Sequence, residues 1–300
     1  MLIMVYSVAS MAVLVYDALI LFGEEVDLIW KARWTFPKAL YLLSRYTPFI
    51  DLAVDLYHTL AFPQPSPEAC QSSYVFISWS MVIGMGLSEV VMILRIYAMR
   101  GRSKRVLYSL VTLWGILIII GLFFSNRVAY SVTFGQLNIP GLDGMGLTGC
   151  HNLPTPSFSL AASFVSLLAM EAVIVVLTVL TAVNRWNERY QFESFDMTFK
   201  TLYFDGIFFF LCLLGFSLLN ITFTLLTDNP ALTPIFIAPM RVMHGILSCR
   251  MLLNIRRVAA KIVVLPLPVV VPPPPGLRSF DRHFGLGRDR RGPARAGLRR

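Results

Sequence analysis

The chain has 300 residues, of which 56% are hydrophobic and only 14% are charged, and its formal net charge is +9. A soluble domain typically has about 25% charged residues, so this composition excludes an ordinary soluble globular protein. The positive charge is concentrated in a few short segments between apolar stretches, and we therefore do not interpret it as evidence for nucleic-acid binding.

Seven apolar segments follow one another along the chain, and about 20 apolar residues are enough for an α-helix to cross a bilayer. They predict an all-α bundle of seven transmembrane helices that contacts the lipid bilayer and occupies residues 1–257. No room is left for a separate soluble catalytic domain. The predicted spans are roughly 2–22, 38–61, 74–98, 106–125, 159–183, 201–226 and 232–253.

Connections rich in Lys and Arg alternate along the chain with connections that have almost none. This alternation predicts the orientation, because basic loops stay in the cytoplasm. The first, third and fifth connections and the C-terminal tail are basic, whereas the second and sixth have no Lys or Arg and the fourth has only Arg127. We therefore expect the N-terminus outside and the C-terminus in the cytoplasm. The basic residues that set this pattern include Lys31, Arg33, Lys38, Arg100, Arg102, Lys104, Arg105, Arg185, Arg189 and Lys200.

Two of the four cysteines, Cys70 and Cys150, lie in predicted outer loops, where disulfides persist. We predict a disulfide between them, against the alternative of two free thiols. Cys212 lies inside the sixth span and is expected to be a small buried hydrophobe. Cys249, near the inner end of the seventh span, is expected to pack, and palmitoylation is the alternative.

The longest outer connection, 126–158, is rich in Gly and Pro and is either a lid over an outer cavity or a linker held by the disulfide. The C-terminal segment, 258–300, is rich in Pro and Arg and is expected to be a disordered basic tail. This tail would either lie on the anionic inner leaflet or be solvated. A third alternative is that the segment results from an imperfect gene prediction.

Ionisable residues inside predicted spans usually face the bundle interior and mark functional sites. The candidates for a ligand site are Asp51, Asp55, His58, Glu89, Glu171, Arg241 and His244. Asp51 and Arg241 lie at similar depths in the second and seventh spans, which predicts an ion pair that Asp55 and His244 would join. The pair would either fix helix packing or belong to a polar ligand or ion site between the second, third, fifth and seventh helices.

Four further charged residues lie near the inner ends of spans: Asp17, Arg45, Arg95 and Asp205. We expect them to reach the interface with their charged groups or to cap helices. Gly84, Gly86 and Ser88 predict close helix approach in the third span, and Pro234 and Pro239 predict an irregular start of the seventh.

No motif of a serine hydrolase, a zinc protease or a nucleotide-binding loop is present in the sequence. The Tyr-Asp at 16–17 also has no Gly-x-Gly-Asp partner of the kind that intramembrane aspartyl proteases need. We therefore expect no enzymatic activity, no cofactor and no metal.

Several segments resemble a family of fungal, mainly basidiomycete, multi-pass membrane proteins that is defined by an N-terminal domain of unknown function. The resemblance begins with VYDALILFGEEVDLIW and KALYLLSRYTPFID, continues through MILRIYAMR, and ends with ILSCRMLLNIRR. It covers about residues 10–257 and implies a seven-helix architecture without an established activity. The residues that match are Tyr16, Asp17, Glu25, Trp30, Lys38, Tyr41, Arg45, Tyr46, Cys150, Asp205, Gly206, Arg250 and Asn254.

Two classes of function remain. A receptor-like sensor would bind a small-molecule ligand and recruit a cytoplasmic partner to the loops 99–107 and 184–200, although Leu94-Arg95-Ile96-Tyr97 stands where many receptors have an acidic-Arg-Tyr triplet. A transporter or channel would line a path with the intramembrane charges, but no internal repeat supports it. A membrane scaffold is the third alternative. The plasma membrane or another secretory-pathway membrane suits the outer disulfide.

Overall fold

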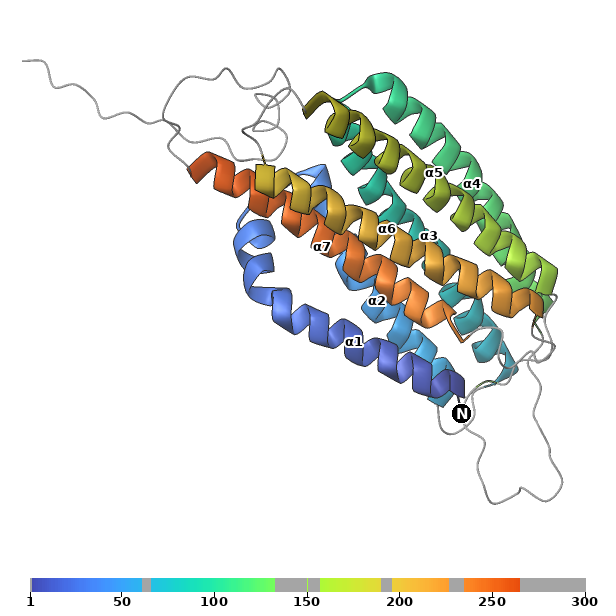
Figure 1. Cartoon of the computed structure of the whole chain (residues 1–300). Coiled ribbons are helices and arrows are strands. Elements are labelled where there is room, and N and C mark those ends of the chain that lie inside the picture. The colour runs from blue at the N-terminus through green and yellow to red at the C-terminus, as the bar shows by residue number, and fades with distance from the viewer. Residues whose placement is uncertain are drawn as a thin grey trace, which may run out of the picture.

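The computed structural model describes residues 2–60, 66–132, 150, 157–189, 196–226 and 235–264, and side chains within 5–58, 66–132, 150, 158–184, 206–226 and 235–257. These residues form an all-helical bundle (Figure 1). Its helices are α1 (Leu2–Glu25), α2 (Phe36–Leu60), α3 (Pro67–Met99), α4 (Lys104–Ser131), α5 (Ser157–Arg189), α6 (Asp196–Leu226) and α7 (Ile237–Val264).

Each helix covers most of one predicted apolar segment, but the first or last residue of each helix differs from the predicted one. α3 begins at Pro67, seven residues before the predicted start, because the Ser66 side chain accepts a hydrogen bond from the Ala69 backbone N–H and caps the helix. α7 continues to Val264, past residue 257 where the predicted helical domain ends. Residues 265–300 of the predicted tail, and most of the 126–158 connection, lie outside the described residues.

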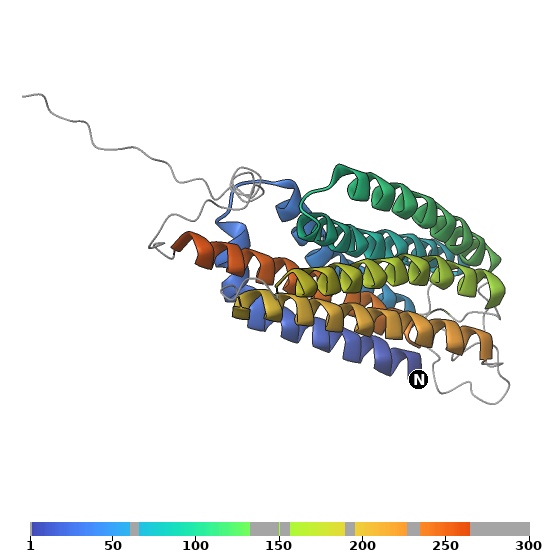
Figure 2. The ribbon, with the colours of Figure 1, turned by 45° about the horizontal axis from the view of Figure 1, so that its top comes forward.

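The helix α7 occupies the centre of the bundle. It packs against α1, α2, α3 and α6, whereas α4 packs against α3 and α5. α1 and α4 lie on opposite sides of the molecule in both views (Figures 1 and 2). The main apolar core draws mainly on α3, α5, α6 and α7, and it also includes Leu40 of α2 and Leu110 of α4. Met92, Ile174 and Leu213 are fully or almost fully buried in it.

Five helices are long and apolar enough to cross a membrane: α1 with its continuation, α3, α4, α5 and α6. Their outward faces carry large apolar side chains such as Leu19, Ile119 and Phe208, which is the surface that lipid tails contact. The chain is thus a multi-pass membrane protein. α2 and α7 are not among the five, and both carry several charged residues.

The predicted disulfide is present between Cys70 at the start of α3 and Cys150, with Cα atoms 5.7 Å apart. Cys150 also donates its backbone N–H to the carbonyl oxygen of His58 on α2, at 2.8 Å. These contacts fix Cys150 to the end of the bundle at which α2 ends and α3 begins. Cys249 is buried, as expected, and Cys212 is half-buried.

Candidate functional site

Buried polar groups follow the inward side of α7 and meet charged side chains of four other helices. We call them the central pair (Asp51 and Arg241), the carboxyl–histidine cluster (Glu89, Glu171 and His244) and the end network (Asp17, Glu25, Arg45 and Arg250). All are almost fully buried except Arg250. They divide the interior into three polar levels along one helix.

The predicted ion pair between Asp51 and Arg241 is confirmed. Arg241 Nε lies 2.7 Å from Asp51 Oδ2, and both side chains are fully buried. Arg241 Nη2 donates to Thr47 Oγ1 at 2.7 Å, and Ser80 Oγ donates to Asp51 Oδ1. The pair therefore joins α2, α3 and α7, while Arg241 Nη1 has no hydrogen-bond partner among the described residues.

Two glycines permit close packing beside the central pair. A Cβ atom on Gly84 of α3 would overlap the Arg241 guanidinium. One on Gly245 of α7 would come within 2.9 Å of Pro48 Cγ and 3.2 Å of the Ser44 carbonyl oxygen, both on α2. The expected close approach at Gly84 is thus a contact with an arginine. At Gly86, the neighbouring side chains are Ile118 and Trp114 of α4.

The candidates Asp55 and His58 lie nearer the disulfide end of α2. Asp55 Oδ2 accepts a hydrogen bond from Ser7 Oγ of α1 at 2.7 Å. His58 Nδ1 lies 2.8 Å from Ser73 Oγ of α3. The contact between Ser7 and Asp55 places the beginning of α1 at the end of the bundle at which α2 ends and the disulfide lies.

The carboxyl–histidine cluster brings together α3, α5 and α7. His244 Nε2 lies 3.0 Å from Glu171 Oε1, and Glu89 is close enough for electrostatic interaction with Glu171. Sequence analysis named all three residues but associated His244 with the Asp51–Arg241 pair. The correct neighbour of His244 depends on the rotation of α5 relative to α7, which residue spacing along one helix does not give.

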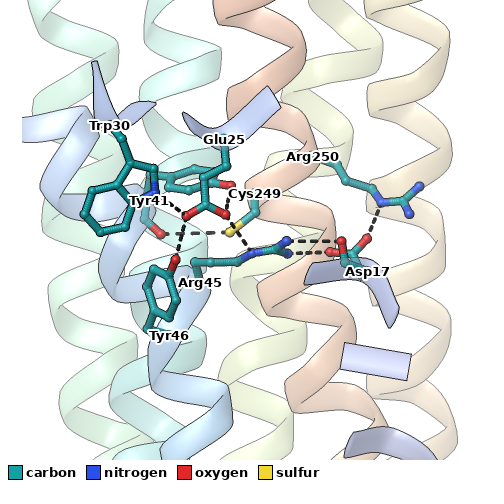
Figure 3. Close-up of polar contacts among 8 residues, drawn as sticks. All are labelled: Asp17, Glu25, Trp30, Tyr41, Arg45, Tyr46, Cys249 and Arg250. Carbon is teal, nitrogen blue, oxygen red and sulfur yellow. Dashed lines mark hydrogen bonds and ion pairs between the residues drawn. The ribbon is translucent and has the colours of Figure 1, made fainter. Parts of the chain in front are cut away.

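The end network lies toward the opposite end of the bundle, where α1 ends and α2 begins. Figure 3 shows its contacts. Asp17 Oδ2 pairs with Arg45 Nη1, and Asp17 Oδ1 accepts from Arg250 Nε at 2.7 Å. Arg45 Nε also lies 3.4 Å from Glu25 Oε2. One carboxylate on α1 thus binds two guanidinium groups, one from α2 and one from α7.

Glu25 is a second centre of the end network. Trp30 Nε1 and the Tyr46 hydroxyl donate to Glu25 Oε1 at 3.0 and 2.7 Å, and the Tyr41 hydroxyl donates to Oε2 at 3.2 Å (Figure 3). A buried carboxylate is stable only when it is paired and hydrogen-bonded. Glu25 meets the first condition through Arg45 and the second through the three aromatic donors.

The backbone geometry that positions these donors is a π-helical turn, Val26–Trp30, which continues α1 directly. Such turns are rare and often mark functional sites. Lys38 is buried and donates its Nζ to the carbonyl oxygens of Trp30 and Ala32, at 3.0 and 2.7 Å. Lys38 therefore caps the end of this turn, although the sequence analysis counted it among the loop charges.

The expectation that Asp17, Arg45 and Arg95 reach the membrane interface is wrong for these three residues, because they are buried. Asp17 and Arg45 neutralise each other, and Arg95 packs over the Phe210 ring and against Gly206 of α6. The side chain of Asp205 lies outside the described residues.

The remaining residues of the family pattern differ in exposure. Tyr16 is 66% exposed and points away from the core. Asn254 accepts a hydrogen bond from Arg257, which also pairs with Glu24. Among the described side chains, no group of three or more His, Cys, Asp or Glu residues is placed to hold a metal ion.

Sequence reasoning did not identify Thr47, Ser80 and Ser7, which complete the buried pairs. Their positions relative to the charged residues give a signal in one case: Thr47 precedes Asp51 by four residues and shares its helix face. The contacts of Ser80 and Ser7 depend on how neighbouring helices are rotated.

Residues 5–50 match the model of a family of unknown function (DUF6533). This match includes α1, the π-helical turn and the first part of α2, and so contains Asp17, Glu25 and Arg45 of the end network. No curated protein matches the chain. The α1–α2 half of the end network is thus built from the segment that defines this family.

Proposed function

We propose that all seven helices cross the bilayer, with the N-terminus outside and the C-terminus in the cytoplasm. The central pair supports this for α2 and α7, since neutralised charges cost less inside a membrane than single ones. The Ser7–Asp55 contact puts the beginning of α1 at the same end as the disulfide. Because disulfides persist in oxidising compartments, an outside location suits this end of the bundle. The basic Arg100–Arg105 turn lies at the other end of α3.

We propose further that the protein is a receptor-like sensor of the fungal multi-pass family that its motifs resemble, in the plasma membrane or another secretory-pathway membrane. The observation that carries this proposal is Arg241 Nη1, a fully buried donor without a partner among the described residues. A small molecule with a carbonyl, carboxylate or phosphate oxygen would satisfy it. Binding there would act on α2, α3 and α7 together.

The other candidates of the ligand site then have distinct places around this position. Asp55 and His58 lie toward the disulfide end, from which a ligand would enter. Glu89, Glu171 and His244 lie on the cytoplasmic side of Arg241. A ligand that displaces Thr47 or Ser80 would change the packing of α7, and the 99–107 and 184–200 loops are the proposed sites for a cytoplasmic partner.

The test is a thermal-shift screen of small molecules on the protein in nanodiscs. We expect a ligand that raises the melting temperature of the wild type and of the control variant Glu24→Gln, but not of Asp51→Asn or Glu171→Gln. Glu24 is a suitable control because its ion pair with Arg257 is peripheral and 43% exposed. Recruitment of a partner by the same ligand would then be measured.

Two results would favour the alternatives. Substrate-coupled or pH-dependent currents in proteoliposomes would favour a transporter or channel. A screen without a ligand, with Asp51→Asn and Glu171→Gln both simply less stable, would favour a membrane scaffold in which these charges hold the helices together.

A further inference from the structure

The carboxyl–histidine cluster has too much negative charge for its surroundings. Glu89 and Glu171 are 3% and 2% exposed, and His244 is fully buried. Glu89 Oε1, both oxygens of Glu171 and His244 Nδ1 have no hydrogen-bond partner among the described residues. His244 Nε2 is at ion-pair distance from Glu171 but at an angle that forms no hydrogen bond.

Among the described side chains, no lysine or arginine is paired with this cluster. On α7, Arg241 is paired with Asp51 of α2. On α3, Arg95 follows Glu89 by six residues, and its guanidinium packs over the Phe210 ring and against Gly206 of α6. The described parts of α5 and α6 add only Glu171 and Cys212 to the ionisable groups, and Trp114 of α4 lies beside Glu89 as a neutral indole.

The number of protons on the cluster follows from the charges of its two carboxyl groups and its imidazole. Two ionised carboxylates and a neutral imidazole carry −2, and a protonated imidazole reduces this to −1. A second proton makes the cluster neutral, as a bundle interior requires of groups without a counter-ion. The described side chains are not placed to hold a metal ion there instead.

We propose that Glu89, Glu171 and His244 form a proton-binding site, in which at least one carboxyl group stays protonated at neutral pH while the other faces the imidazole. The site lies on α3, α5 and α7, so its protonation controls how closely these three helices pack. The proton-binding site does not require the ligand proposed at Arg241, although Glu171 belongs to both.

Infrared spectroscopy tests the proposal, because a protonated carboxyl group has a carbonyl band distinct from that of a carboxylate. The protein would be measured at neutral pH in D2O and in a maltoside detergent, which has no carbonyl group. We expect the wild type to show the band, and Glu89→Gln or Glu171→Gln to lose it in part or completely. Glu24→Gln, at a half-exposed ion pair, should leave the band unchanged.

Asp55 is another buried carboxyl group, and Asp55→Asn separates its contribution to the band. The proposal is overturned if the wild type shows no such band, or if Glu89→Gln and Glu171→Gln both keep its full intensity. The Gln side chain has the shape of a protonated Glu, so these variants should fold.

Stability gives a second readout. A folded protein that holds a proton which the unfolded chain releases becomes less stable as the pH rises. The melting temperature of the wild type should therefore fall between pH 6 and 9 relative to that of the Glu89→Gln/Glu171→Gln double variant. Parallel pH profiles for the two proteins would contradict the proposal.

Discussion

At the scale of single residues, the interior depends on a close fit between one arginine and one glycine. Arg241 occupies the space that a side chain at position 84 would fill. The guanidinium is hydrogen-bonded to Asp51 and Thr47, so moving it away from Gly84 would break these hydrogen bonds. A substitution as small as one methyl group is therefore expected to disturb the central pair.

We predict that Gly84→Ala lowers the free energy of unfolding by about 1–3 kcal/mol, the usual cost of overpacking. Gly115→Ala on α4 is the matched control, since a Cβ there would meet nothing within 4 Å, and its effect should stay within about 0.5 kcal/mol. Denaturation of the two variants in the same detergent measures the difference. Equal melting curves would mean that Arg241 can move away from Gly84.

The pair itself predicts unequal effects of single and double substitutions. Arg241→Met leaves the Asp51 charge buried and unpaired and should cost about 3–5 kcal/mol, whereas an apolar pair of similar volume is often neutral. We therefore expect the double variant Asp51→Leu/Arg241→Met to unfold at a higher temperature than Arg241→Met. A double variant less stable than this single one would show that the two residues do not depend on each other.

At the scale of helices, the end of α1 is defined by the π-helical turn and Glu25. The turn keeps Trp30 within reach of Glu25, and α2 supplies Tyr41, Tyr46 and Arg45 to the same carboxylate. Glu25 and the adjacent Glu24 have opposite environments, since their side chains are 2% and 43% exposed. Substitutions of these two adjacent glutamates therefore compare a buried carboxylate with a half-exposed one.

Glu25→Ala is expected to destabilise the protein by about 3–5 kcal/mol, because Arg45 and three donors lose their acceptor in a buried place. Glu24→Ala removes a half-exposed ion pair with Arg257 and should cost at most about 1 kcal/mol. Thermal unfolding of both variants checks the order. Similar losses for the two would argue that water enters the end network freely.

The helices themselves could be predicted from the sequence, because an apolar segment of sufficient length has few alternatives. The ion pair between Asp51 and Arg241 could also be predicted, since the two residues lie at similar distances from the ends of their helices. The partner of His244 and the burial of Lys38 could not be predicted in this way. Both depend on helix rotation and on a π-helical turn, neither of which leaves a periodic signal in the sequence.

At the scale of the whole molecule, the disulfide and the end network hold opposite ends of the bundle. Cys70 and Cys150 are 80 residues apart, and closing a loop of that length restricts the unfolded chain by about 4 kcal/mol in the chain-entropy model. The disulfide also marks one end of the bundle chemically, which makes the proposed orientation measurable.

We predict that Cys70→Ser lowers the melting temperature and leaves Cys150 as a free thiol on the outer face. A membrane-impermeant maleimide should then label Cys150 in intact cells, while the double variant Cys70→Ser/Cys150→Ser gives the background from Cys212 and Cys249. Labelling that appears only after permeabilisation would reverse the proposed orientation.

Asp51 and Arg241 are 190 residues apart in the chain, so the carboxylate on α2 is synthesised long before its partner on α7. At about 5–20 residues per second, translation of that interval takes on the order of 10–40 s. During this time Asp51 has no guanidinium to neutralise it, and an unpaired charge inside a membrane is costly. Nascent chains that stop before α7 should therefore be recognised as incomplete and degraded, which makes the last helix a built-in checkpoint of biosynthesis.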